Sequence, residues 1–303
     1  MKSILCKPLR AMVLPLMMLT LAAVVFLACS DDDDEAVVVP TQPAPTFHGK
    51  KLLEAMDFRF EYDKEGRCYH AVNTIVPDSF TSVVYPSYRI DYNKRKFYIE
   101  DNPRFFDVTF TNEGYLKTVG GSWSHFSDNG DYGKKGEDKY TFSYDGAGHL
   151  IKIVYTSESE GRVLWSGQTF STKYVTTLHW EGDNLQQIVK QCQTVNNGVK
   201  REESVAYRYD YDGTKNDTGL MLSVYSKWLE FPPFAMVGLM GKSPAELPVR
   251  LTCTGYNTFE PGNATTFQYA YNITYEKNEA GNISVVNYAD GLGFTTVATY
   301  QYQ

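Results

Sequence analysis

Hydrophobic and polar residues alternate along several stretches of the chain, which predicts long β-strands with one packed face. From Phe267 to Tyr275 aromatic and aliphatic side chains occupy every odd position, while Thr, Gln, Ala and Asn occupy the even positions. The segments 205–211 and 294–302 repeat this alternation. Because successive side chains of a strand point to opposite faces, one face of each strand is expected to pack and the other to meet water.

A short recurring phrase marks the turns between these strands. It combines alternating aromatic or aliphatic residues, an acidic residue, a few further residues and a glycine, often followed by a Leu-x-x-Ile/Val run. Asp and Asn side chains start turns by bonding to their own backbone, and glycine accepts a positive φ, so each phrase predicts a hairpin. The six phrase glycines are Gly66, Gly114, Gly148, Gly182, Gly213 and Gly281.

The segment Gly219 to Leu247 departs from this pattern. Leu220, Val224 and Trp228 fall at helical spacing, and so do the residues that follow each of them. Pro232 and Pro233 are expected to break the chain, and 234–240 reads as a second short apolar helix. Such an apolar pair of helices must be buried.

Together these patterns predict an all-β fold in a single domain over residues 48–303. We expect an antiparallel meander of about 12–15 strands that closes into a barrel or splits into two packed sheets. The helical insertion at about 219–241 either plugs the barrel or covers an outer face. A membrane-spanning barrel is disfavoured, because tyrosine recurs along whole strands and the opposite faces carry Thr, Gln and Asn.

The first 47 residues predict export and lipid attachment. Lys2, Lys7 and Arg10 precede an apolar run, and Phe26-Leu27-Ala28-Cys29 resembles a lipobox. Residues 1–28 are therefore predicted to be a lipoprotein signal peptide, with Cys29 the lipidated residue and 29–47 an acidic, proline-rich tether. The acidic run Asp31 to Glu35 resembles a surface-export signal of Bacteroidetes lipoproteins. The alternative for the apolar run is a membrane-spanning helix, and the alternative for the acidic run is a simple solvated spacer.

Charge and cysteine content narrow the possible partners. Loss of the signal removes three of 29 basic and none of 36 acidic residues, which leaves a formal charge of −10. The chain has no basic stripe, so nucleic acid is not an expected partner.

Cys68, Cys192 and Cys253 remain in the domain. Their odd number allows at most one disulfide, and their spacing fits no zinc site. Three small buried hydrophobic side chains are the favoured interpretation.

The hairpin phrases, of the form Tyr-Asp-x-x-Gly-x-Leu, resemble Bacteroidetes lipoprotein families of unknown function that are described as porin-like in fold. The stretch 238–242, Gly-Leu-Met-Gly-Lys, with Leu247-Pro248 after it, is similar to a segment common in those families. The first phrase departs from the pattern, because Arg67-Cys68-Tyr69 stands where Gly-x-Leu is expected. The resemblance implies a porin-like β fold and brings no established activity.

No catalytic, cofactor or metal site stands out in the sequence. Solvated histidines are the favoured interpretation of His149, in a hairpin turn, and of His179, on a polar strand face. The loop Asp128 to Asp131, with Glu137 and Asp138 nearby, offers oxygen ligands but lacks the spacing of a calcium-binding loop. Trp123 and Trp165 lie outside the phrases and are the best candidates for exposed rings, although core packing is favoured even for them.

These observations favour a non-catalytic lipoprotein in the outer membrane, exposed at the cell surface, that binds a ligand, a glycan or a protein partner. A structural or accessory subunit of an outer-membrane assembly is the alternative. A glycan hydrolase is less favoured, and a close carboxylate pair in a cleft with one strongly raised pKa would be its signature.

Overall fold

A computed structural model describes residues 50–74, 86–100, 104–126, 132–163, 166–260, 263–290 and 295–303. Sixteen antiparallel strands form one closed barrel in which each strand pairs with its sequence neighbours and β1 pairs with β16. The strands are β1 (Leu52–Ala55), β2 (Phe58–Tyr62), β3 (Cys68–Asn73), β4 (Tyr88–Asp91), β5 (Lys96–Ile99), β6 (Arg104–Phe110), β7 (Leu116–Phe126), β8 (Tyr132–Tyr144), β9 (Leu150–Val163), β10 (Ser166–Glu181), β11 (Asn184–Asn196), β12 (Val199–Lys215), β13 (Glu246–Glu260), β14 (Asn263–Lys277), β15 (Ile283–Asp290) and β16 (Thr295–Tyr302).

The predicted all-β fold is confirmed, and of the two predicted closures the barrel is the one formed. The strand number exceeds the predicted range by one, because β1, β4 and β5 have only four residues each, too few for an alternation to be recognised in the sequence. The predicted signal peptide, Cys29 and the tether lie outside the described residues.

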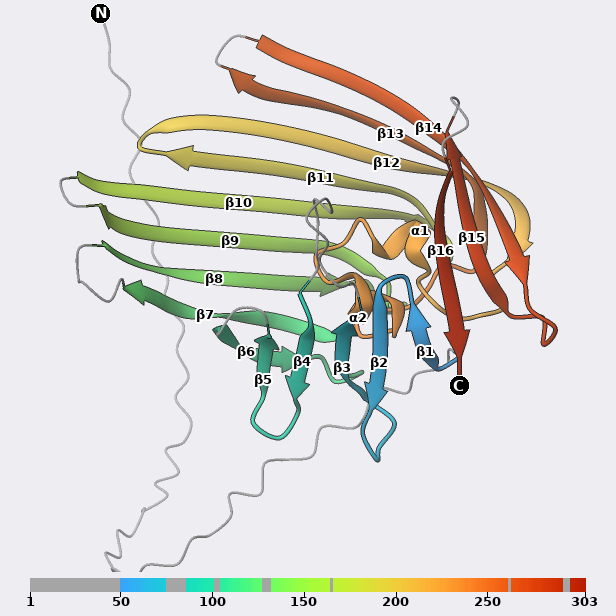
Figure 1. Ribbon diagram of the computed structural model, residues 1–303. Helices are drawn as coiled ribbons and strands as arrows, with labels where there is room; N and C mark the ends of the chain where they lie inside the picture. Colours follow the sequence, from blue (N-terminus) through green and yellow to red (C-terminus); the bar gives the residue numbers. More distant parts are fainter. Residues whose placement is uncertain are drawn as a thin grey trace, which may run out of the picture. The chain divides into compact units, whose positions relative to one another are not determined.

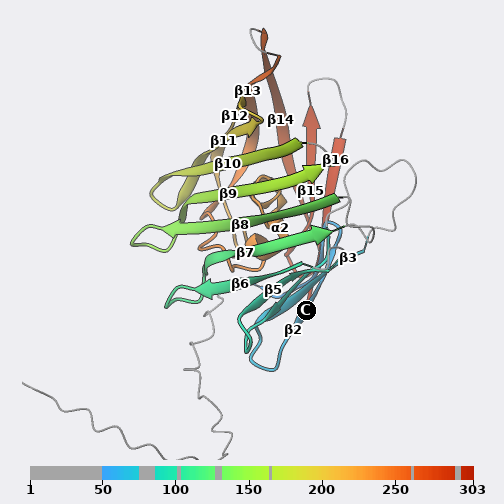
Figure 2. The same ribbon diagram turned by 90° about the vertical axis from the view of Figure 1, so that its left-hand side faces the viewer.

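Strand length divides the barrel into a tall side and a short side. Strands β7 to β14 have 11 to 17 residues, whereas β1 to β6 have four to seven and β15 and β16 have eight. At about 3.3 Å per residue, β12 is roughly 55 Å long. The long strands therefore project well beyond the short ones, as Figures 1 and 2 show. We call the inner face of this projecting part the trough.

Inner and outer faces of the barrel have opposite chemistry. Along β12, Tyr207 and Tyr209 face the interior, while Arg208 and Asp210 are exposed on the outside. The even positions of β14 from Thr266 to Thr274 are likewise polar or small and face outward. A barrel wall in contact with lipid needs an outward apolar band, which these strands lack. The two described helices are also both too short to cross a membrane.

Five of the six predicted phrase glycines form hairpin turns with a positive φ. Gly66, Gly114, Gly148, Gly182 and Gly281 have φ between +58° and +92°. Gly213 is the exception, because it lies within β12 at an irregularity in the pairing with β13 and not in a hairpin turn. The segment between β12 and β13 replaces that turn, which explains the double spacing before the last phrase.

An aromatic side chain at or near the end of each even-numbered strand closes the barrel at the end that carries the phrase turns. In seven of these eight even-numbered strands the aromatic side chain donates a hydrogen bond to a carbonyl at or near the start of the preceding strand, at distances of 2.6 to 2.9 Å. The eighth, Phe110 on β6, has no hydroxyl and stacks on Tyr92. The donors are Tyr62, Tyr92, Tyr144, Trp180, Tyr211, Tyr275 and Tyr302. The recurring aromatic of the phrase therefore serves to lock the strand ends.

Replacement of Tyr144 by phenylalanine should lower the free energy of unfolding by about 1 kcal/mol, because the ring is kept and one hydrogen bond is lost. The hydroxyl of Tyr144 donates to the Leu116 carbonyl at 2.7 Å. Urea unfolding measures the change, and Tyr256→Phe is the matched control since Tyr256 is exposed. Equal stability of the two variants would show that this bond contributes nothing.

The helical insertion is a plug inside the barrel. Helix α1 spans Ser223–Ser226 and α2 spans Pro232–Met236, so both are shorter than predicted. As expected, the helical segment is interrupted before Pro232 and Pro233, but the two prolines belong to the second helix and do not precede it. They occupy the first turn of α2, where a backbone N–H has no helical partner to lose. Val237 to Met240 continue as turns and not as the predicted second helix.

The contacts of the helical insertion decide whether it plugs the barrel or covers an outer face. Phe231 and Phe234 pack against Tyr88 on β4 and Phe97 on β5. On the opposite side, the hydroxyl of Tyr209 on β12 donates to the Val224 carbonyl, and Ser223 bonds to the hydroxyls of Tyr288 and Tyr300 on β15 and β16. Only a segment enclosed by the strands can reach all of these partners, and Figure 1 shows it there.

Candidate functional site

The wall of the trough changes its chemistry beyond the plug. On β9 the inward positions are Ile153 and Tyr155 near the plug and then Ser157 and Ser159. The neighbouring strands follow the same order, because Tyr140 precedes Asp138 on β8 and Tyr174 precedes Thr172 on β10 in the direction away from the plug. We call Ser157, Ser159 and Thr172, together with the carboxylate of Asp138 in the same part of the wall, the hydroxyl band. Each of them is buried although polar.

Aromatic rings border the hydroxyl band on the side of the plug. Tyr140, Tyr155 and Tyr174 occupy one cross-strand row, with ring centroids 4.4 Å apart for the first pair and 5.6 Å for the second. The Tyr155 hydroxyl donates to Oδ1 of Asp138 at 3.2 Å. Burial holds the pKa of the Tyr140 and Tyr174 hydroxyls far above the ordinary value, so both stay protonated donors at physiological pH.

Three hydroxyls of the band are not used by the protein itself. Within the described part of the chain, no hydrogen bond occupies the side-chain oxygens of Ser157, Ser159 and Thr172. A polar group on an inner face is expected to find a partner in protein, water or ligand. These hydroxyls are therefore available to a ligand that enters the trough.

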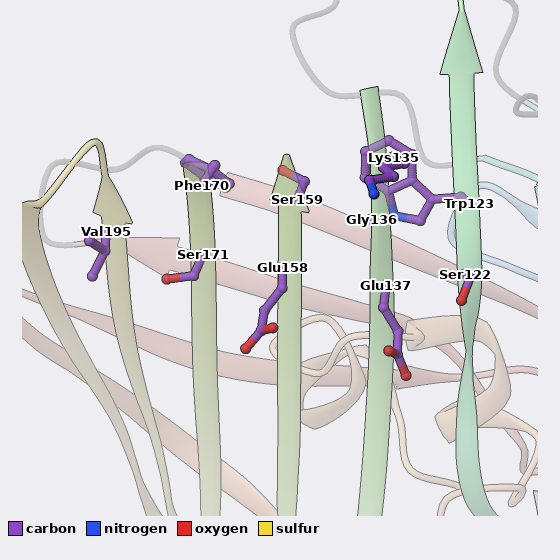
Figure 3. Close-up of a pocket in the computed structure, with 10 residues that line it drawn as sticks. All are labelled: Ser122, Trp123, Lys135, Gly136, Glu137, Glu158, Ser159, Phe170, Ser171 and Val195. Carbon is purple, nitrogen blue, oxygen red and sulfur yellow. The ribbon is translucent and has the colours of Figure 1, made fainter. Parts of the chain in front are cut away.

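A hollow of about 670 Å³ lies at the far end of β7 to β11, away from the phrase glycines. Two adjacent cross-strand rows supply its lining residues except Lys135, which lies one position further along β8. The first row faces the trough and consists of Trp123, Gly136, Ser159 and Phe170. The side chains of the second row, which includes Glu137 and Glu158, point to the opposite face of the sheet, because adjacent positions of a strand alternate. Figure 3 shows Trp123 and Phe170 on opposite sides of Ser159.

Two glycines let aromatic rings lie flat on the wall. Trp123 is the cross-strand partner of Gly136, and a Cβ at Gly136 would come within 2.8 Å of Trp123 Cζ2 and 2.5 Å of the Glu158 carbonyl oxygen. On β13 and β14 the same arrangement recurs, since the ring of Phe267 covers Gly255. Phe267 also stacks on Tyr269 with the ring planes 13° apart, and Tyr269 is 47 % exposed. Flat, accessible rings thus stand on both flanks of the trough.

The outcome differs between the two tryptophans singled out in the sequence. Trp123 is half-buried and lines the hollow, so it is neither a core residue nor a fully exposed ring. Trp165 lies outside the described residues, and so does the loop Asp128 to Asp131. Of its acidic neighbours, Glu137 is exposed and Asp138 is buried in the hydroxyl band. The described residues contain no group of three His, Cys, Asp or Glu side chains arranged to hold a metal.

The prediction for His149 is wrong and that for His179 is confirmed. His149 is 2 % exposed, stacks on Trp180 at 4.3 Å, and its ring nitrogens lie 3.0 Å from Asp145 and 3.1 Å from Asp183. A hairpin turn was expected to be solvated, but this one folds back against the closing end of the barrel, where Lys242 donates its backbone N–H to the Gly148 carbonyl. His179 is exposed on the outer face.

All three domain cysteines are free thiols. Cys68 and Cys253 are buried, as predicted, and Cys192 is half-buried. Burial raises the pKa of the Cys68 thiol to about 12 and that of Cys253 to about 11. Because the thiolate is the nucleophile, neither of these two groups is reactive at neutral pH.

The described residues do not show the feature expected of a glycan hydrolase, which is a close carboxylate pair in a cleft with one strongly raised pKa. Glu137 and Glu158 face each other across β8 and β9, but both are exposed. A raised carboxyl pKa occurs at Asp57, where burial alone raises it. Asp57 lies in the turn between β1 and β2 and does not line the hollow. The two features that mark a catalytic carboxylate pair are therefore not found together.

The hydroxyl band was not recognised in the sequence. The signal for it was present, because the inward positions of β9 change from Ile153 and Tyr155 to Ser157 and Ser159. A change from apolar to hydroxyl side chains on the inner face indicates where a core ends and an accessible cavity begins.

Comparison with protein-family models finds no match, and comparison with curated proteins finds none either. Among solved structures, the chain is similar to a porin-like protein from Bacteroides vulgatus ATCC 8482. The identity is 10 %, the match covers 84 % of this chain and 99 % of the other, and the TM-score is 0.50. A porin-like protein from Bacteroides uniformis ATCC 8492 matches 69 % of this chain and 95 % of its own at 11 % identity, with a TM-score of 0.20. The first likeness agrees with a porin-like barrel, while membership of the resembled lipoprotein families stays a prediction.

Proposed function

We propose that this protein is a lipoprotein, anchored through Cys29 at the bacterial outer membrane and exposed at the cell surface, that binds a glycan in the trough without transforming it. The outward charged face of the strands supports a barrel that stands in water, held to the membrane by its lipid. The fold shared with a porin-like protein from Bacteroides agrees with an outer-membrane setting.

The observation that carries the glycan proposal is the hydroxyl band between aromatic rows. Sugars present hydroxyl edges that need hydrogen-bond partners and apolar C–H faces that stack on rings. The trough offers the unoccupied hydroxyls of Ser157, Ser159 and Thr172, and flat rings at Trp123 and Phe267. Ligand sites in proteins combine aromatic walls with a few placed polar groups in this manner.

Binding calorimetry with the mature, unlipidated chain tests the proposal. An oligosaccharide panel should contain ligands with dissociation constants of about 1 mM or below, equivalent to about −4 kcal/mol. Heats that stay flat across the whole panel would overturn glycan binding. A protein partner captured in place of a sugar would support the accessory-subunit alternative.

The variant Gly136→Ala should weaken glycan binding about tenfold and lower stability by about 1–3 kcal/mol. The added methyl group would meet the Glu158 carbonyl oxygen at 2.5 Å and displace the Trp123 ring from its seat. Gly146→Ala is the matched control, since a Cβ there meets no atom within 4 Å. Unchanged affinity in Gly136→Ala would exclude Trp123 as a stacking platform.

A further inference from the structure

The plug presents an unusual set of polar side chains at its boundary with the trough. Trp228 stacks on Tyr207 with ring centroids 4.1 Å apart. On β12, Tyr209 is fully buried against the plug, whereas Tyr207, one inward position further along, is half-buried. The segment 227–230 therefore forms the floor of the trough.

Lys227 is a cation on this floor, and no carboxylate in the described part of the chain pairs with it. Its Nζ lies 3.8 Å from the ring centroid of Tyr288 and 4.5 Å from that of Trp228. No ion pair joins it to another described residue. Ring faces attract an ammonium, but they do not neutralise it. Burial lowers the pKa of Lys227 to about 8, so most of the population is still charged at pH 7.

Two further polar atoms on the floor are unsatisfied. Trp228 Nε1 and Glu230 Oε2 are buried and have no hydrogen-bond partner among the described residues. The other carboxylate oxygen of Glu230 lies 3.2 Å from Lys190 Nζ and 3.1 Å from the Thr176 hydroxyl. Glu230 thus pairs with Lys190, and no ion pair joins it to Lys227.

An unsatisfied donor, an unsatisfied acceptor and an ammonium without an ion pair call for a ligand group with complementary chemistry. A carboxylate would neutralise Lys227, and neighbouring hydroxyls could donate to Glu230 and accept from a ring N–H. A uronic acid carries both functions on one sugar ring. Isolated buried charges are unfavourable unless they are paired, so the retention of Lys227 among half-buried residues at the boundary with the trough points to binding.

We propose that the floor of the trough is a binding site for an acidic sugar, with Lys227 as the residue that pairs with its carboxylate. This proposal rests on the proposed glycan binding and specifies the class of sugar. The hydroxyl band and the rings of the wall contact the rest of the chain of sugars, and the floor selects for the acid.

Calorimetry with a glucuronate-containing oligosaccharide and its carboxyl-reduced counterpart tests the site. The wild-type protein should bind the acidic form about tenfold more tightly, and Lys227→Met should remove this preference while binding of the reduced form is kept. Lys173→Met is the control, because Lys173 is exposed on the outer face of β10. Lys227→Arg, which keeps the charge, should retain part of the preference.

The possible outcomes separate this proposal from the broader one. Equal affinity of the wild type for both ligands, or a preference that survives in Lys227→Met, would overturn the acidic site and leave glycan binding intact. Binding of neither ligand would overturn both. If Lys227→Met does not fold, Lys227→Gln provides the same comparison with a polar side chain in its place.

Discussion

Replacement of Phe234 by alanine is expected to lower the free energy of unfolding by about 4 kcal/mol, the typical effect of removing a fully buried phenylalanine. Phe234 on α2 has no exposed surface, and its ring lies 5.7 Å from Phe97 and 6.0 Å from Tyr88. These contacts join the plug to the short side of the barrel. Because β4 and β5 have only four residues each, little pairing of their own can compensate for the loss.

Urea unfolding monitored by circular dichroism measures this effect. Phe105→Ala is the matched control, since Phe105 is 57 % exposed on the neighbouring strand β6 and should change stability by no more than about 0.5 kcal/mol. A Phe234→Ala variant as stable as this control would mean that the plug only occupies the barrel and does not stabilise it.

The regular parts of the fold were predictable because one physical rule governs them. Alternation along 205–211 and 267–275 identified the inward faces, and the phrase glycines identified the turns. Both signals are local, so the sequence alone carries them. Strands of four residues, such as Leu52–Ala55, carry too few alternations to be recognised, and only pairing with β16 and β2 fixes them.

Other features depended on contacts between distant segments. Gly213 follows the phrase faithfully, but the chain after it enters the barrel, so the glycine forms a bulge and not a hairpin. His149 lies in a turn, yet the stretch after the plug packs against that turn and buries it. No local pattern reports which turn is covered. The acceptors of the closing tyrosines, up to 28 residues away in sequence, were invisible for the same reason.

The candidate site contains residues that a local sequence pattern could reveal and residues that only contacts between distant segments bring together. Ser157, Ser159 and Thr172 could have been recognised as hydroxyls on an inward face once the strand parity was known. The floor could not, because Lys227, Trp228 and Glu230 belong to the irregular plug, and their partners on β10, β11, β12 and β15 are set by the closure of the barrel. Helical periodicity assigned Trp228 to a buried face, whereas it stands at the boundary between plug and trough.

Replacement of Lys227 by methionine should raise the free energy of unfolding by about 1–3 kcal/mol at pH 7, although it is expected to abolish selection for an acidic sugar. Methionine fills a similar volume between the rings of Tyr288 and Trp228 and removes a largely buried charge that has no carboxylate partner among the described residues. Stability lost to a functional group is a recurring feature of binding sites, and its recovery on mutation is the measurable sign.

The pH dependence of this gain provides the decisive control. Burial lowers the pKa of Lys227 from 10.5 to about 8, so between these values the unfolded chain binds the proton that the folded chain releases. Desolvation of the Lys227 ammonium therefore lowers the unfolding free energy of the wild type by its full amount below pH 8, and this loss disappears as the pH rises toward 10.5. Tyr288, the ring nearest the ammonium, stays neutral over this window, because burial holds its pKa well above the ordinary value. The difference in unfolding free energy between Lys227→Met and wild type should shrink from pH 8 to pH 10.5, whereas Lys173→Met should show no such trend. A difference that is constant with pH would mean that Lys227 is not a desolvated cation, and the acidic-sugar site would lose its physical basis.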